Sequence, residues 1–127
     1  MFALAATLTL LAAGIAAQPA PPTVHDNYTG ELPNAPGKHF TATTVTYPAG
    51  GKSKPHHHDA FVFAYVLSGH VRSQVEGEAV HVFGPGESWT ETPGAHHVVS
   101  ENASATEPAS FIAVLVSDTG KAAKKDD

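Results

Sequence analysis

Short runs of strand-forming residues, separated by glycine and proline, constrain the fold of this chain more than any other feature. Glycine or proline interrupts nearly every window, and no stretch keeps the 3.6-residue apolar period of an amphipathic helix. The runs lie at residues 40–47, 61–67, 70–75, 79–83, 88–91, 96–100 and 111–116. Short strands separated by turn signals are typical of β-barrels and β-sandwiches. We therefore predict an all-β fold.

The densest of these runs, residues 61–67, consists of aromatic, branched and small apolar residues. Continuous apolar character in a strand indicates burial on both faces. We expect this strand to be central, with Phe61, Phe63, Phe83 and Phe111 in the core.

The 127 residues suffice for one domain, and the composition changes at both ends of it. Residues 1–17 are almost wholly apolar and precede a proline-rich stretch, which predicts a signal peptide and export to the periplasm or the extracellular space. An uncleaved or membrane-tethered terminus is the alternative. We expect an irregular arm over residues 18–38, a barrel over 39–117 and a flexible polar tail over 118–127. The mature chain then has no stable membrane span.

Charge and cysteine content exclude several classes of function. The chain has 12 Asp and Glu against 7 Lys and Arg, a net charge of -5, and no basic stripe that would fit nucleic acid. It has no cysteine, so neither a disulfide nor a thiolate ligand or nucleophile is available.

Two histidine clusters about forty residues apart are the strongest indication of chemistry. The first is His56-His57-His58, and the second is His96-His97. Because side chains alternate along a strand, His56 and His58 share one face, with backbones roughly 6.6 Å apart. Both rings can then reach one ion, at about 2.0–2.1 Å for zinc. One histidine of the second cluster would complete a three-histidine site, and alternation allows only one of the two to point inward.

The first cluster lies within a longer frame of glycines. Gly50 is followed by five residues, then by the histidines; Val62 comes after three more residues, and Gly69 closes the frame. The second cluster has a frame of its own, in which Gly86 precedes Thr92, Gly94 and His97. These two frames resemble the paired motifs of the cupin superfamily, within which the chain is most similar to small single-domain, quercetin-dioxygenase-like members.

The resemblance implies a double-stranded β-helix, or jelly-roll barrel, with a mononuclear metal inside it. It selects His97 rather than His96 as the third ligand beside His56 and His58. Two positions depart from the pattern: Val62 stands where the family has a glutamate ligand, and Glu101 stands at the family's asparagine position, next to Asn102.

Valine cannot bind a metal, so the site is expected to hold one divalent ion with three neutral histidines and water. Iron, manganese, zinc, nickel and copper all remain open as the ion. Glu91, which shares a strand face with Trp89, is a candidate catalytic base or hydrogen-bond partner of a metal-bound water.

These observations predict a metal-binding cupin that acts on a small oxygen-bearing organic molecule by dioxygenase-type oxidation or isomerisation. The alternative is a non-catalytic module that binds or senses a small molecule with weak or no metal. The family also implies a homodimer, which the Val- and Phe-rich strands favour.

Overall fold

The computed structural model describes residues 13–121 and 124–127, and every regular element in them is a β-strand. The prediction of an all-β fold is confirmed. The strands are β1 (Thr23–Glu31), β2 (Lys38–Tyr47), β3 (His56–His57), β4 (Ala60–Ser68), β5 (Val71–Val75), β6 (His81–Phe83), β7 (Ser88–Glu91), β8 (His96–Asn102), β9 (Ala109–Asp118) and β10 (Lys125–Asp126).

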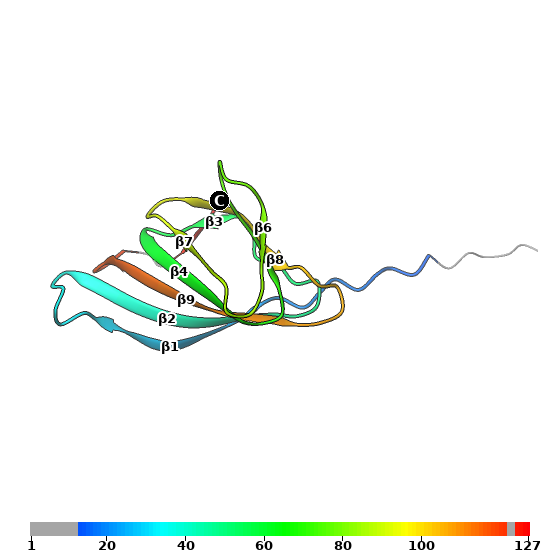
Figure 1. Ribbon diagram of the computed structural model, residues 1–127, viewed down its shortest axis with the longest axis horizontal. Helices are drawn as coiled ribbons and strands as arrows, with labels where there is room; N and C mark the ends of the chain where they lie inside the picture. The colour runs from blue at the N-terminus through cyan, green and yellow to red at the C-terminus, as the bar shows by residue number, and fades with distance from the viewer. Residues whose placement is uncertain (1–12, 122–123) are drawn as a thin grey trace, which may run out of the picture.

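The strands form two antiparallel sheets of five strands each, which face one another across the core (Figure 1). The first sheet has the order β1-β2-β9-β4-β7, and the second has the order β10-β3-β8-β5-β6. Most neighbours within a sheet are distant in sequence, so the chain crosses repeatedly between the layers. This arrangement places residues from all parts of the chain around one interior.

Strand β4 alternates between buried and exposed residues from Ala60 to Leu67. Its even-numbered apolar residues from Ala60 to Val66 point into the core, whereas Phe61, Phe63, Tyr65 and Leu67 are each about 40% exposed on the outer face. The prediction that this strand is buried on both faces, with Phe61 and Phe63 in the core, is therefore wrong. An antiparallel sheet can leave one face to solvent, and an apolar run by itself does not distinguish the two cases.

The main core cluster lies between the sheets and is built around Trp89 and Phe111. The ring centres of these two residues are 5.4 Å apart, and Tyr47 lies 5.6 Å from Phe111 on the other side. Val66 and Val71 are fully buried beside them. A smaller cluster of Ala60, Val62 and Leu115 continues the apolar interior along β4 and β9.

Gly69, which closes the first sequence frame, shows why that frame needs a glycine. Its φ of +69° is in the left-handed region, and a Cβ atom there would collide with the carbonyl of Pro108. Glycine alone meets both conditions at low energetic cost. The turn lets β4 and β5 leave for different sheets while staying close to the start of β9.

Both ends of the chain are more ordered than the sequence indicates. Residues 23–31, expected within an irregular arm, form β1 and pair with β2 along its length. Lys125 and Asp126, expected in a flexible tail, form β10 and pair with His57 and His56. Backbone pairing overrides the polar composition in both places, because an edge strand needs only an available partner.

The expected signal peptide lies largely outside the described residues, which begin at residue 13; residues 13–17 are exposed and have no regular secondary structure. Within the described part of the chain, no helix is long and apolar enough to cross a membrane.

Replacement of Phe111 by alanine is expected to lower the free energy of unfolding by about 3–5 kcal/mol, because it leaves a cavity between Tyr47 and Trp89. Phe63→Ala, on the outer face and 38% exposed, is the matched control and should cost about 1 kcal/mol. Urea unfolding measures both. Equal losses would contradict the placement of the core.

Candidate metal centre

The pairing of β3 with β8 brings the two histidine clusters together. His56 pairs directly with His97, and His57 pairs with His96. Because paired residues on adjacent strands share a face, one pair points inward and the other outward. His56 is 6% exposed and His97 is 3% exposed, whereas His96 is exposed. The clusters therefore meet on neighbouring strands of one sheet rather than across the barrel.

His58 joins the inward pair from the residue after β3. The ring centre of His56 lies 5.0 Å from that of His58 and 5.1 Å from that of His97, both in edge-on arrangements. Three imidazoles bound to one ion at about 2.1 Å and at angles of about 90–110° have ring centres about 5 Å apart. The spacing around His56 fits such an arrangement.

The three histidines line a cavity of about 380 Å³ between the two sheets. Core residues such as Val62, Phe111 and Leu115 form apolar parts of its wall, and the three histidines and Glu91 are among the polar groups that line it. Small-molecule sites typically combine apolar walls with a few convergent polar groups. His39, which the sequence analysis gave no role, also lines this cavity.

Two hydrogen bonds orient the histidine rings. His56 Nδ1 lies 2.7 Å from the carbonyl oxygen of Lys54, which can only accept, so Nδ1 donates and Nε2 is left with its lone pair. His97 Nε2 lies 2.7 Å from the hydroxyl of Ser73. Partners of this kind fix the tautomer and the orientation of metal-binding imidazoles. Sequence reasoning missed Ser73, because only the pairing of β5 with β8 brings it near His97.

Glu91 lies inside the cavity and contacts His97. One carboxyl oxygen, Oε1, is 3.1 Å from His97 Nδ1 and accepts a hydrogen bond of 3.1 Å from Trp89 Nε1. The other oxygen, Oε2, is buried and has no hydrogen-bond partner among the described residues. The side chain is 4% exposed, so solvent does not satisfy this oxygen. A buried acceptor without a partner is unusual and calls for a physical reason.

Burial favours the neutral form of both Glu91 and His97. It raises the pKa of Glu91 above the usual carboxyl value and lowers the pKa of His97 to about 3. The neighbouring His56 and His58 lower the pKa of His97 further, and burial also lowers that of His56. Neutral imidazoles with available lone pairs are the form that binds metal.

Val62, the residue at the place of the family's glutamate, also faces this cavity. It is 2% exposed and belongs to the smaller apolar cluster. Its direct partner across the β4–β7 pair is Glu91.

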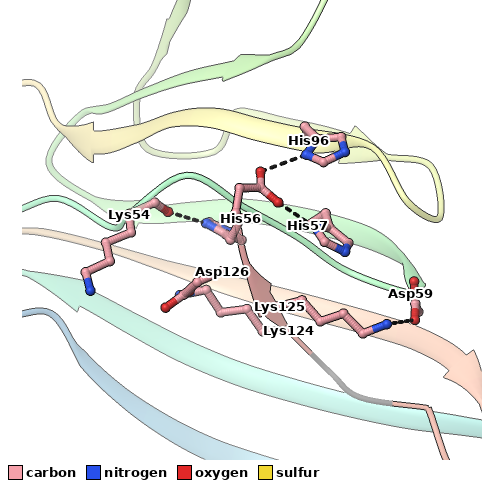
Figure 2. Close-up of polar contacts among 9 residues, drawn as sticks. Lys54, His56, His57, Asp59, His96, Lys124, Lys125 and Asp126 are labelled. Atoms are coloured by element: carbon pink, nitrogen blue, oxygen red, sulfur yellow. Dashed lines mark hydrogen bonds and ion pairs between the residues drawn. The ribbon is translucent and has the colours of Figure 1, made fainter.

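The outward histidines have a partner of their own. His57 Nδ1 and His96 Nδ1 lie 2.6 and 2.7 Å from the two carboxylate oxygens of Asp127, so one carboxylate joins both rings (Figure 2). Among the described residues, these three bring their ligand atoms within 4.8 Å of one another, whereas the three inward histidines do not form such a group. The hydrogen bond to Asp127 raises the pKa of His96. This outer cluster of His57, His96 and Asp127 attaches β10 to the second sheet.

The outer cluster has further support from nearby residues. Lys125 Nζ lies 2.7 Å from Asp59 (Figure 2). The backbone N–H of Asp127 donates to the carbonyl of Pro55. The same segment places Lys121 and Lys124, both exposed, at the lining of the cavity. The positive charge of Lys124 lowers the pKa of His56 and His97.

The comparison with protein families agrees with this arrangement. A family model described as "Cupin domain" matches residues 43–115, which is more than half of the chain. The chain belongs to the cupin family. The matched region runs from β2 to β9 and contains both histidine clusters. No curated protein matches the sequence.

Solved cupin structures share the fold at low sequence identity. An uncharacterised Klebsiella pneumoniae protein with a double-stranded β-helix domain has a TM-score of 0.65 and 17% identity, over 85% of this chain and 87% of its own. The DMSP lyase of Ruegeria pomeroyi has a TM-score of 0.60 and 23% identity, over 68% of this chain and 42% of its own. Oxalate decarboxylase of Bacillus subtilis has a TM-score of 0.59 and 19% identity, over 71% of this chain and 24% of its own. This chain thus spans less than half the length of either enzyme.

Replacement of Asp127 by alanine is expected to release β10, since it removes the carboxylate that joins His57 and His96. Hydrogen exchange at residues 124–127 should become faster, with little change in global stability. Asp126→Ala is the control, because Asp126 makes only an exposed ion pair with Lys124 among its side-chain contacts given by the structure. Unchanged exchange in Asp127→Ala would show that backbone pairing alone holds β10.

Proposed function

We propose that His56, His58 and His97 hold one divalent metal ion, and that the protein acts there on a small oxygen-bearing organic molecule. The observation that carries this proposal is that three imidazoles, from clusters about forty residues apart, line one cavity, with the ring centres of His58 and His97 each about 5 Å from that of His56. Two of these rings are almost fully buried.

The donor set fits such an ion. The His56 tautomer leaves Nε2 with its lone pair, and the low pKa of His97 keeps its ring neutral. When bound, a divalent ion would supply Lewis-acid polarisation of a substrate oxygen and, if it is a redox metal, a centre for oxygen chemistry. Neutral histidine ligands leave the charge of the ion in place, which favours an anionic substrate.

The protein's own side chains support the same class of substrate. Apolar side chains such as Phe111 and Leu115 form part of the cavity wall and lower the local dielectric, which strengthens electrostatic contacts inside the cavity. Lys121 and Lys124 are exposed residues of the lining and therefore lie at its open side. Their charges attract an anion toward the cavity. Oxalate, named as a substrate of one structural neighbour, is a small anion of this kind.

Elemental analysis of the purified protein is expected to find about one metal ion per chain, and His58→Ala should lose it, because two histidines alone make a weak site. His57→Ala is the matched control: it removes a histidine of the outer cluster but leaves the three inward rings intact. Loss of the ion in His57→Ala, with retention in His58→Ala, would contradict the proposal and assign the ion to the outer cluster.

The metal-loaded protein is expected to consume oxygen with at least one compound from a panel of β-diketones, flavonols, catechols and small carboxylates. The panel covers oxygen-bearing molecules that can chelate an ion. An oxygen electrode measures uptake, and the His58→Ala variant gives the metal-free background. Tight metal binding without turnover on any compound would favour the non-catalytic binding module.

A further inference from the structure

We infer that Glu91 is a metal ligand and replaces, from the neighbouring strand, the carboxylate that the family pattern places at Val62. The inference rests on the proposed metal site and completes its ligand set. It makes the centre one of three histidines and one carboxylate.

The sheet register provides the first argument. Val62 and Glu91 are direct partners across the β4–β7 pair, and both are buried on the same interior face. Directly opposed residues have Cβ atoms about 4.5–5.5 Å apart, a gap that the longer side chain can span. A glutamate on β7 can therefore place its carboxylate where a glutamate on β4 would otherwise reach. The loss of one ligand and the presence of the other occur at a single register position.

The contact with His97 provides the second argument. Glu91 Oε1 and His97 Nδ1 are 3.1 Å apart. This distance places the carboxylate beside the imidazole, within reach of an ion that His97 would hold. The Ser73 hydroxyl, 2.7 Å from Nε2 on the other side of the ring, can accept a hydrogen bond from Nε2–H, and Nδ1 then keeps its lone pair. Without an ion, one proton shared between Glu91 and His97 keeps the two acceptors together.

The unpaired oxygen provides the third argument. Trp89 orients Glu91 through Oε1, whereas Oε2 is buried in the cavity wall and has no hydrogen-bond partner among the described residues. A core position offers no reason to keep an acid with an unsatisfied oxygen, since an apolar residue would be more stable there. An ion in the cavity gives this carboxylate a partner.

A ligand role differs from a role as general base in what it changes. A ligating carboxylate contributes to affinity for the ion and neutralises one of its two charges, so that one positive charge remains to favour an anionic substrate. A carboxylate also suits hard ions such as manganese better than histidines alone. A general base affects turnover but leaves metal affinity nearly unchanged. Metal affinity is therefore the deciding measurement, and it does not depend on knowing the substrate.

The test is titration of the metal-free protein with Co²⁺, followed by visible absorption and competition with a chelator. Glu91→Gln preserves the size of the side chain and its ability to accept from Trp89, but removes the negative charge. It is expected to weaken Co²⁺ binding at least tenfold and to change the Co²⁺ absorption bands. Glu76→Gln, at an exposed turn, is the matched control and should bind as the wild type does.

The double variant Val62→Glu with Glu91→Gln should regain most of the lost affinity, because it returns a carboxylate to the family position across the same register pair. A merely structural role of Glu91 predicts no such recovery. Recovery would also show that the chain still folds when it carries the Glu91→Gln substitution.

A spectroscopic measurement tests Glu91 without replacing it. Zn²⁺ added to the His57→Ala protein, whose outer cluster is incomplete, should perturb one carboxylate in the infrared difference spectrum. The absence of any carboxylate change would overturn the assignment of Glu91.

The outcomes separate the two proposals. Normal Co²⁺ affinity in His58→Ala would overturn the metal site itself. Loss of binding in His58→Ala, together with wild-type affinity and absorption in Glu91→Gln, would overturn only the ligand role of Glu91.

Discussion

The register between β3 and β8 is the constraint on which the rest of the site depends. It pairs His56 with His97 and His57 with His96, so one pair of rings enters the core and the other faces outward. A shift by a single residue would exchange the two faces and place an exposed ring in the cavity. The short strand β3 has only two residues, and pairing on both edges, with β8 and β10, fixes it in place.

The outward pair, His57 and His96, attaches β10 to β3, the strand that carries His56. The carboxylate of Asp127 joins His57 and His96, and this contact holds β10 beside β3. The same C-terminal segment carries Lys121 and Lys124 to the lining of the cavity. The pairing of β10 with β3 thus brings positive charge to the lining of the cavity beside the strand that carries His56.

The presence of Val62 at a position where the family has a charged residue makes sense within the sheet rather than within the motif. A strand pair can supply a side chain to one interior position from either member, because opposed residues share a face. Val62 extends the apolar cluster with Leu115, while its partner Glu91 brings the acidic group into the cavity against His97. Val62 interrupts the family motif along the chain, but Glu91 still brings a carboxylate into the interior.

The sequence was sufficient to predict the all-β class, the cupin family and the inward orientation of His56 and His97, because turn residues, motif spacing and a side-chain period of two are local properties. It failed for the outer face of β4, for β1 and for β10, because burial and edge pairing depend on which strands become neighbours. Only the tertiary structure could place Ser73 and Glu91 beside His97, or close Asp127 onto His57 and His96. These contacts join residues 6 to 70 positions apart, and no periodicity along the chain encodes a long-range register.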